Sequence, residues 1–510
     1  IWGRDSTHPP ADPSAYQHEQ ENLWYRYISP DGLMSDPRRL TDFSGSWGLQ
    51  AVNFTVRGNR LYGAYTAVRN NETTPSSYRA VEGFVEGYLD AWEPAVQLTA
   101  WDFNEDPGQL QPEYWPSIDV SGLGGEVTVV YGVRTVSPFL YTGKSDVYGC
   151  VRGAGAGAGW SAPQNMTSAA GNEGWLPLFV FYRDGADFAT VFTFRRTITI
   201  DATHPPREDA FLIYHSGGAW RTPVNITRVA TQQDGSYFSI ELDSLQNLHF
   251  AYMVVSYLWA VDHWESQGAE LRYTRETGAG MSAPATILTY FHQRYFDNVI
   301  LAMDRDGNTH VLFSTLMSDG TTAWNRNIGH ATNAPGGDPG GFGPPMLLRP
   351  STTYDLYGLT LSTFPDGDVL ASWFEKGFNG GGDPIYGRMY SRYHDGDAWG
   401  STLVVSSIPG STDILHVEPT SWPGYEYATV SGTGEQQAVF ETAKYDTVAG
   451  AWYDFRKYFT ETVNGVWATP QLIASGGLDG VDPALYADGG QRYFVLYTPT
   501  DPATAKEVLY

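Results

Sequence analysis

A short phrase returns along this chain, in which a turn and a tryptophan are followed by a small or polar residue and a proline. Its clear copies are Gly159–Pro163, Ala219–Pro223, Gly280–Pro284 (with Met281 in place of tryptophan) and Val466–Pro470. Looser copies begin at Ala91 and Ala398. The copies lie roughly 60 residues apart, with some positions skipped, and a fixed period of this size indicates a repeat architecture.

The residues between the copies predict strands rather than helices. The 510 residues include 56 Gly and 31 Pro, which fall between short apolar runs as turns between strands do. No stretch keeps the apolar spacing of an amphipathic helix. With 15% aromatic residues the chain can bury a large core. A closed ring of small sheets is one unit at this length, so we expect one domain over residues 22–510 and an N-terminal arm over residues 1–21.

The second repeat shows the unit most clearly. Its strands are expected at residues 115–120, 126–133, 146–152 and 160–166. Alternate residues from Val127 to Val133 are apolar, which places them on one face of a strand. Four short antiparallel strands joined by turns form one blade of a β-propeller.

The same pattern predicts six more complete units and one divided unit. The complete units are expected at residues 47–101, 171–230, 235–291, 294–352, 354–408 and 413–475. An eighth begins near Asp479, and residues 22–41 resemble the third and fourth strands that it lacks. The predicted fold is therefore an all-β, eight-bladed β-propeller closed by N- and C-terminal strands, with seven blades as the alternative. Residues 506–510 also resemble a strand, so either the last blade mixes both ends or the gene continues past Tyr510.

Charge and cysteine content restrict the partners. The net charge of -26 repels nucleic acid and anionic membranes, and no run of 18 apolar residues could span a bilayer. Cys150 is the only cysteine, so no internal disulfide is expected. The start at Ile1, without Met, is typical of a processed N-terminus. Glycosylation sequons stand at Asn53, Asn71, Asn165 and Asn225, and together these features predict a secreted or cell-surface glycoprotein.

A second phrase carries a family resemblance. Asp304–Val311 reads Asp-x-Asp-Gly-x-x-His-Val, and Leu245–Phe250 is a looser copy. With the Trp-Ser-x-Pro phrase, the pattern resembles the BNR-repeat, sialidase-like superfamily of propellers over nearly the whole chain. His394–Trp399 and Ser318–Trp324 are fragments of that superfamily's Asp-box. The resemblance concerns the scaffold, since the catalytic residues of sialidases have no matching motif here, and its relatives include hydrolases, lyases, lectins and structural proteins.

Candidate binding residues gather where the first strands begin. In a propeller these positions share a face with the connections between second and third strands. Aromatic, acidic or amide residues recur there, and the substrate-binding candidates among them are Glu113, Trp115, Glu173, Trp175, Tyr295, Asp297 and Tyr357. Aromatic rings stack on sugars and carboxylates accept hydrogen bonds from hydroxyls. The structural alternative is that the rings pack between blades and the acids cap turns.

Two connections between second and third strands are unusually rich in charge. The arginine loop, residues 194–209, contains Arg195, Arg196 and Arg207. The tryptophan loop, residues 259–265, contains Trp259, Asp262, His263, Trp264 and Glu265. Because they belong to successive blades, we expect the two loops to be neighbours on the same face.

These residues fit three kinds of chemistry. In a uronate lyase, the loop arginines would neutralise the sugar carboxylate while His263 and Tyr237 remove the C5 proton. In a glycosidase, Asp262 or Glu265 would act with Glu173 or Asp297. A binding module needs only Trp259, Trp264 and polar neighbours.

The sequence thus predicts an extracellular carbohydrate-active protein that acts on a polysaccharide or glycan. A polysaccharide-degrading enzyme, either a lyase or a glycoside hydrolase, is favoured. The alternative is a non-catalytic glycan-binding or structural, adhesive protein that assembles through its propeller. No metal-ligand spacing occurs, so no metal is assigned, although Asp383 and the glycines before it suit calcium.

Overall fold

The regular structure of the chain consists of β-strands. The computed structural model describes residues 23–25, 35–36, 38–43, 47–57, 60–70, 78–88, 91–103, 110–121, 125–137, 140–154, 158–167, 173–183, 189–197, 208–230, 232–260, 263–277, 280–291, 294–304, 306–318, 324–334, 339–350, 354–364, 368–378, 383–395, 398–408, 414–416, 428–430, 436–447, 451–463, 466–476, 484–487 and 493–496. They belong to two compact units, one containing β1–β16 and the other β17–β37, except that Gln233 and His263 belong to the first unit and residues 35–36 to the second. Each unit is described by itself below.

Unit 1 contains three antiparallel sheets, and one parallel pair of residues, Ser145 with Gly174, joins the second sheet to the third. The first consists of β3 (Trp47–Arg57), β4 (Arg60–Asn70), β5 (Tyr78–Tyr88), β6 (Ala91–Trp92) and β7 (Val96–Phe103). The second consists of β8 (Leu110–Val120), β9 (Val127–Ser137), β10 (Leu140–Arg152) and β11 (Gln164–Asn165). The third consists of β12 (Glu173–Tyr182), β13 (Ala189–Thr197), β14 (Glu208–Ser216), β15 (Ala219–Trp220) and β16 (Val224–Asn225). The short β1 (Trp24–Tyr25) pairs with β2 (Arg38–Arg39).

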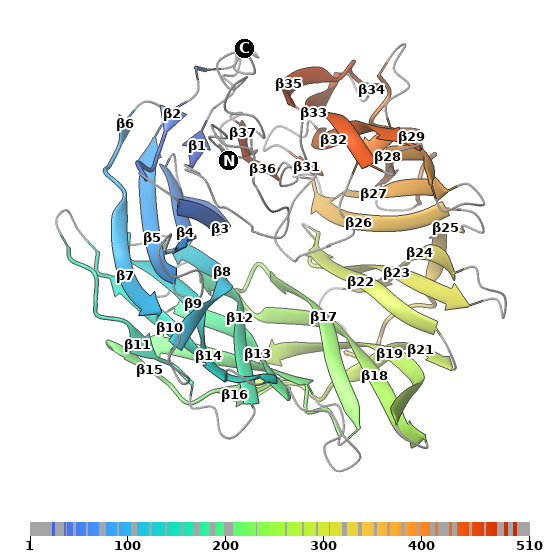
Figure 1. The fold of residues 1–510 in the computed structure, drawn as a ribbon. Coiled ribbons are helices and arrows are strands. Elements are labelled where there is room, and N and C mark those ends of the chain that lie inside the picture. The colour runs from blue at the N-terminus through green and yellow to red at the C-terminus, as the bar shows by residue number, and fades with distance from the viewer. Residues whose placement is uncertain are drawn as a thin grey trace. The chain divides into compact units, whose positions relative to one another are not determined.

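Unit 2 contains four more sheets of the same kind (Figure 1). The first consists of β17 (Gln233–Leu242), β18 (Leu248–Ala260), β19 (His263–Thr277), β20 (Gly280–Met281) and β21 (Ala285–Phe291). The second consists of β22 (Arg294–Met303), β23 (Thr309–Ser318), β24 (Trp324–Asn333) and β25 (Met346–Arg349), and the third of β26 (Tyr354–Thr363), β27 (Val369–Phe378), β28 (Pro384–His394) and β29 (Leu403–Val404). The fourth consists of β30 (Ile414–His416), β31 (Ala428–Val430), β32 (Gln436–Asp446), β33 (Ala451–Val463), β34 (Val466–Trp467) and β35 (Gln471–Gly476). A separate pair consists of β36 (Ala484–Ala487) and β37 (Tyr493–Leu496).

The seven sheets confirm the seven predicted units, with boundaries within a few residues. Each has four principal antiparallel strands, because polar turns interrupt the apolar runs at regular intervals. The two-stranded pairs β1–β2 and β36–β37 lie where the divided eighth unit was expected. Its closure into a ring, and hence the number of blades, stays a prediction. The N-terminal arm and residues 506–510 lie outside the described residues.

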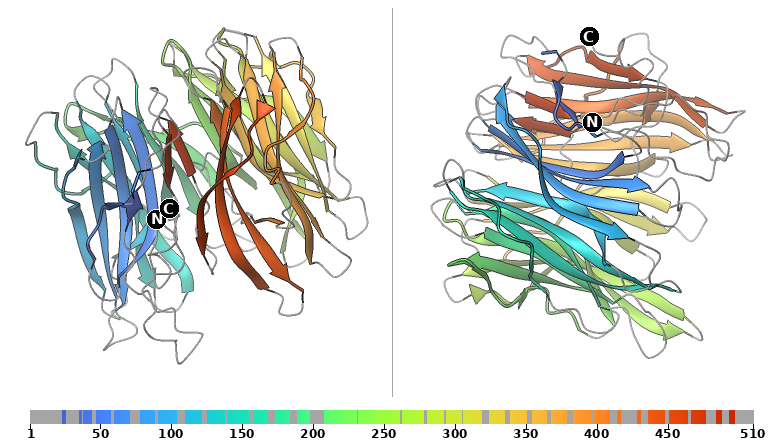
Figure 2. Two further views of the ribbon diagram at one scale, coloured as in Figure 1. Left: turned by 90° about the horizontal axis from the view of Figure 1, so that it is seen from above. Right: turned by 60° about the vertical axis from the view of Figure 1, so that its left-hand side comes forward.

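The sheets of each unit pack face to face, and their apolar faces meet in the core. Val127, Val129, Tyr131 and Val133 of β9 are buried against Phe84 of the preceding sheet, which confirms the alternation predicted for this strand. The first strands of consecutive sheets lie beside each other, as β3 and β8 do in unit 1 and β22 and β26 in unit 2. This is the packing of propeller blades within each unit. The strands are visibly twisted (Figure 2).

The recurring tryptophan packs onto the third strand of the preceding sheet or, for Trp92, onto Tyr25 of β1. The ring centroids are 4.8 Å apart for Tyr25 and Trp92, 4.9 Å for Phe84 and Trp160, and 5.1 Å for His330 and Trp399. Trp467 instead donates a hydrogen bond of 3.0 Å from its Nε1 to Ser391 Oγ. Trp220 packs on Gly149, where there is no room for a side chain, because a Cβ on Gly149 would lie 2.8 Å from the Trp220 ring. We call these packed rings the wedge rings.

One wedge ring was not foreseen. Phe342 packs on Tyr273 of the preceding sheet with a centroid distance of 5.0 Å. It stands in Gly341-Phe342-Gly343-Pro344, a copy of the phrase in which phenylalanine replaces tryptophan. The repeat is therefore more regular in space than in sequence.

Candidate functional site

Residues 198–207 and 261–262 of the two charge-rich connections lie outside the described residues, and most of the others are described only through their backbone. Arg195 and Arg196 lie in β13, Trp259 lies in β18, and His263, Trp264 and Glu265 lie in β19. Arg207 and Asp262 lie outside the described residues. The predicted tryptophan loop is wrong in its extent, because β18 continues to Ala260 and β19 begins at His263. Its aromatic residues extend the strands, as their β-propensity favours. The proximity of the two connections stays a prediction.

Two of the candidates lie near the starts of first strands: Glu173 pairs with Thr197 at the end of β13, and Tyr295 with Leu316 near the end of β23. Glu113 and Tyr357 pair with Gly132 and Phe374, which lie inside β9 and β27. Trp115 lies in β8 and Asp297 in β22. The side chains of these six residues are outside the described part of the structure, and their binding roles stay predictions.

Two candidates have described side chains. Trp175 is 7% exposed and packs on Phe211 with ring centroids 4.7 Å apart, so it belongs to the core of unit 1 and offers little surface to a sugar. Tyr237 is 42% exposed, and its backbone has a positive φ of 51°. That conformation is rare for a bulky residue, and such positions are enriched at functional sites. Tyr237 stays a candidate.

A cluster that sequence reasoning missed lies in unit 2, on β27 and β28 of the sheet β26–β29. We call it the arginine–tyrosine cluster; its members are Arg349, Glu375, Tyr386, Arg388 and Tyr390. In the register of β27 and β28, Glu375 stands opposite Arg388, and Tyr386 and Tyr390 lie two residues to either side of Arg388. Side chains two residues apart in a strand share a face, so Arg388 and both tyrosines project together.

Arg349 reaches the cluster from the preceding sheet. Its Nε and Nη2 donate to the two oxygens of Glu375 at 2.7 and 3.0 Å, which is the paired geometry that suits guanidinium and carboxylate. Trp373 Nε1 donates to Glu375 as well, at 3.2 Å. The hydrogen bond to Glu375 raises the pKa of Arg349, which stays charged. Glu375 is 1% exposed and therefore serves to fix Arg349 rather than to meet a ligand.

The tyrosines and Arg388 form the accessible part of the cluster. The hydroxyls of Tyr386 and Tyr390 are hydrogen-bonded to each other, and both side chains are half-buried. The Arg388 guanidinium lies over the Tyr386 ring, 5.8 Å from its centroid, and is exposed. Burial, together with the hydrogen bond to Tyr390, raises the pKa of Tyr386, which keeps its proton at neutral pH. The cluster thus offers a cation and two hydroxyls beside aromatic rings.

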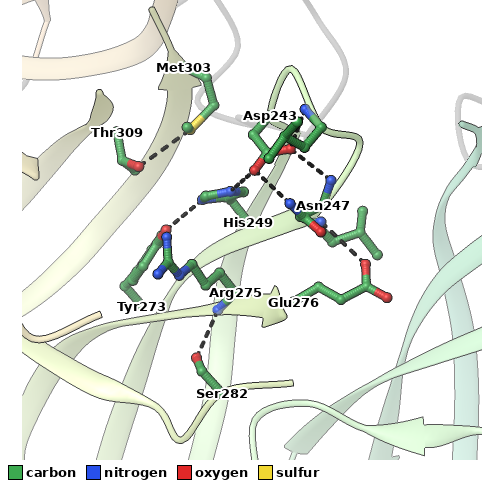
Figure 3. A network of polar contacts seen from close by, with 11 residues as sticks. Asp243, Asn247, His249, Tyr273, Arg275, Glu276, Ser282, Met303 and Thr309 are labelled. Carbon is green, nitrogen blue, oxygen red and sulfur yellow. Dashed lines mark hydrogen bonds and ion pairs between the residues drawn. The ribbon is translucent and has the colours of Figure 1, made fainter. Parts of the chain in front are cut away.

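Another polar network lies where β17 joins β18, in the sheet that contains β17 to β21 (Figure 3). His249 Nε2 is 3.3 Å from Asp243 Oδ2, and its Nδ1 lies within hydrogen-bond distance, 2.5 Å, of the Tyr273 hydroxyl. Asp243 also accepts hydrogen bonds from the backbone and side-chain amides of Asn247, at 2.8 and 2.9 Å. We call this network the first relay.

An acid, an imidazole and a phenol in series are a familiar acid–base set, but burial argues against a substrate role for the first relay. His249 is 2% exposed and Tyr273 is 1% exposed. Burial lowers the pKa of His249 in spite of Asp243, whereas the bonds to Asn247 and His249 lower the pKa of Asp243 against the effect of burial. A neutral imidazole bonded to a carboxylate fixes the turn between β17 and β18. The looser copy of the Asp–Gly–His phrase is therefore a structural motif.

The described residues show neither a metal centre nor a membrane helix. No group of three or more histidine, cysteine, aspartate or glutamate side chains among them is arranged to hold a metal ion. In the same part of the chain no helix is long and apolar enough to cross a membrane. Asp383 is described, but residues 379–382, considered with it for calcium, are not.

Comparison with known proteins gives similarities of structure only. No family profile and no curated protein matches the sequence. An ulvan lyase of polysaccharide lyase family 25 is 8% identical, with a TM-score of 0.42, over 77% of this chain and 94% of that chain. A Hadza microbial sialidase is 12% identical, with a TM-score of 0.37, over 84% and 89% of the two chains. An α-L-arabinanase of Penicillium chrysogenum is 9% identical, with a TM-score of 0.32, over 61% and 90%. Structural neighbours thus include carbohydrate-active propellers at low identity.

Proposed function

We propose that the protein binds an acidic polysaccharide through the arginine–tyrosine cluster. The observation that supports this is the exposed Arg388 guanidinium over the Tyr386 ring, beside a pair of hydrogen-bonded phenols. A uronate sugar has an apolar face, hydroxyls and a carboxylate. The tyrosine rings would stack on the apolar face of the sugar, the phenol groups would form hydrogen bonds with its hydroxyls, and Arg388 would pair with its carboxylate.

The charge of the whole protein argues for a local and specific contact. A net charge of -26 repels a polyanion at long range, so a diffuse electrostatic attraction cannot be the source of affinity. At physiological salt this repulsion is screened beyond about 8 Å, whereas a paired guanidinium and carboxylate are in contact. Binding should therefore persist, or strengthen, when salt is raised modestly. A basic polyanion-binding protein would show the opposite.

A lyase is the second candidate, because the protonated phenol of Tyr386 lies beside the Arg388 guanidinium. In β-elimination a base removes the C5 proton, a C4–C5 double bond forms, and the C4–O bond breaks. The leaving oxygen then takes a proton, which a phenol that stays neutral can supply. Arg388 would neutralise the carboxylate and so stabilise the charge that develops on it. Within unit 2, Tyr237 is the predicted base. A glycosidase is less favoured, because the only carboxylate of the cluster, Glu375, is buried and bonded to Arg349.

The test uses soluble polyuronates and neutral glucans as ligands in titration calorimetry. We expect binding of a polyuronate, weakened roughly 10- to 100-fold by Arg388→Ala, since a charge-assisted contact contributes about 1.5–3 kcal/mol. The matched control is Arg221→Ala, an exposed arginine of unit 1 that bonds Ser216. Ultraviolet absorbance of an unsaturated product would identify a lyase. Equal binding by the wild type and Arg388→Ala, or no binding of any polyuronate, would contradict the proposal.

Arg349→Ala is not a suitable test of binding. It would leave Glu375 as a buried carboxylate without its cation, and such a loss costs about 3–5 kcal/mol of stability. A loss of binding in that variant would report unfolding of the sheet.

A further inference from the structure

A second relay in unit 2 repeats the first relay one sheet later, and none of its members is part of the arginine–tyrosine cluster. Asp304 Oδ1 accepts a hydrogen bond from the Asn308 backbone amide at 2.7 Å, and Oδ2 accepts one from the Asn308 side chain at 2.7 Å. His310 Nε2 lies 3.1 Å from the same Oδ2. Asp304 and His310 are 8% and 4% exposed, so their bond is shielded from water.

The second relay extends further than the first. His310 Nδ1 lies 3.1 Å from His330 Nε2 on β24. Trp399 Nε1, from the next sheet, donates to His330 Nδ1 at 3.3 Å. Both imidazoles are buried, with 3% of His310 and 4% of His330 exposed. Four side chains in series therefore connect a turn of one sheet with the wedge ring of the next.

Simple hydrogen-bond logic fixes the position of each proton. Because His330 Nδ1 accepts from the indole, a neutral His330 carries its proton on Nε2 and donates to His310 Nδ1. His310 must then carry its own proton on Nε2, where it donates to Asp304. The series runs in one direction, from the indole N–H to the carboxylate. It requires both imidazoles to be neutral.

The second relay lies at an interface between two sheets. Trp399 packs in the same buried cluster as Ile328 and Leu348 of its preceding sheet and Trp373 of its own. His394 of β28 adds a third imidazole, with ring centroids 5.9 Å from His310 and 6.1 Å from His330. Proton uptake here would therefore act on the contact between the sheet β22–β25 and the sheet β26–β29.

We propose that the second relay is an acid-sensitive clasp, which holds these two sheets together at neutral pH and opens when its imidazoles take up protons. This inference does not depend on the proposed carbohydrate ligand. A protonated His330 has two donors and no acceptor, so its Nδ1–H would face the indole N–H and its Nε2–H would still face His310. A protonated His310 would likewise direct an N–H toward His330.

The surrounding groups favour the neutral form. The titratable groups that act on the two rings are Asp304 and His394 on His310, and His310 and His394 on His330. Burial lowers the pKa of His310 in spite of Asp304, and burial with the neighbouring imidazoles lowers the pKa of His330 to about 3. An open clasp restores a pKa near 6.5, so protons favour opening. The clasp is complete above about pH 6.5 and weakens as the pH falls from there toward 3.

The first test measures the tautomers directly. In the full-length protein labelled with 15N histidine, long-range 1H–15N spectra at pH 7.5 should show His310 and His330 as neutral Nε2–H tautomers. A neutral Nδ1–H tautomer or a charged ring at either position would overturn the directed series. This result needs no variant, so it stands even if a substitution prevents folding.

The second test measures opening by hydrogen exchange, corrected for intrinsic rates. His330 alone should raise the opening equilibrium of β24 roughly 30-fold between pH 7.5 and pH 5, from the difference between pKa values of about 6.5 and about 3. His330→Gln cannot be protonated and should remove most of that rise. The control, His215→Gln in unit 1, should leave it unchanged. A rise that is as large in His330→Gln as in the wild type, or that appears equally in β8 and β9, would overturn the clasp.

Discussion

The two relays of unit 2 are built on the same sequence spacing and end differently. Asp243 and Asp304 each bond an asparagine four residues later and a histidine six residues later. The histidine then meets a residue of the third strand, which is the phenol Tyr273 in the first relay and the imidazole His330 in the second. The wedge ring that covers this residue is Phe342 in the first relay and Trp399 in the second.

The difference shows what each relay requires of its wedge ring. A phenol donates its own proton to the histidine, so an apolar ring beside it is sufficient. A neutral imidazole, such as His330, uses its one N–H to donate to the next histidine, and its other ring nitrogen is then a buried acceptor. This nitrogen needs a hydrogen-bond donor from another residue. An indole supplies that donor and phenylalanine cannot. The residue on the preceding sheet thus accounts for the tryptophan of the second relay and permits phenylalanine in the first.

The largest effect should come from removal of the carboxylates. Asp304→Ala leaves the Asn308 amides and His310 without an acceptor, and we expect it to lower the free energy of unfolding by about 3 kcal/mol. Asp243→Ala should cost about 2 kcal/mol, because the Asp243 side chain is 17% exposed and water can replace it more readily than at Asp304, which is 8% exposed. Urea denaturation measures both. An equal or larger loss in Asp243→Ala would break the comparison.

Replacement of the donating wedge ring should have the next largest effect. Trp399→Phe gives the second relay the ring of the first and leaves His330 Nδ1 without a donor, at an expected cost of about 2 kcal/mol in unfolding free energy. The matched control is Trp160→Phe, where the tryptophan packs edge-on against Phe84. If both variants lose the same stability, ring packing alone selects tryptophan and the donor is unimportant.

Removal of the phenol should have a smaller effect. Tyr273→Phe keeps the ring that contacts Phe342 but removes the hydroxyl that bonds His249, so we expect a loss of about 1 kcal/mol. Thermal unfolding at pH 7.5 measures it. A loss greater than that in Trp399→Phe would show that the hydroxyl contributes more to the first relay than the indole does to the second.

The smallest effect is expected at the tip of the first turn. Leu245 is 79% exposed, and only its backbone amide bonds Asp243, at 2.9 Å. Leu245→Ser should therefore change the unfolding free energy by less than about 0.5 kcal/mol. A larger loss would mean that the turn depends on an apolar contact as well as on its carboxylate.

Local pattern predicts much of this fold. Turn residues and the repeated phrase locate the seven sheets, since both depend on short-range backbone preferences. The alternation at Val127–Val133 identifies the buried face of β9. The phrase at Asp304–Val311 and its looser copy are also visible in the sequence. The looser copy, read from Leu245, omits Asp243, which is the residue that makes the two turns equivalent.

The contacts between sheets could not be predicted in the same way. His330 and Trp399 lie far apart in the chain, and no periodicity pairs them. Arg349 meets Glu375 across two sheets, although the alternation of Tyr386, Arg388 and Tyr390 can be seen in β28. Aspartate, histidine and tryptophan at residues 259–265 indicated a loop, yet most of these residues extend two strands. Pairing between sheets depends on register, which composition does not encode.

The wedge rings restrict which sheets can be neighbours, because each ring fits a particular residue on the sheet before it. Trp220 fits where Gly149 leaves room, Trp467 finds the hydroxyl of Ser391, and Trp399 finds an imidazole, so each ring matches one particular neighbour. A chain assembled by duplication could at first exchange its copies freely. This one no longer can: transposing two of its repeats would set rings against partners of the wrong size or chemistry, and recombination within the gene would be tolerated only where it keeps adjacent copies together.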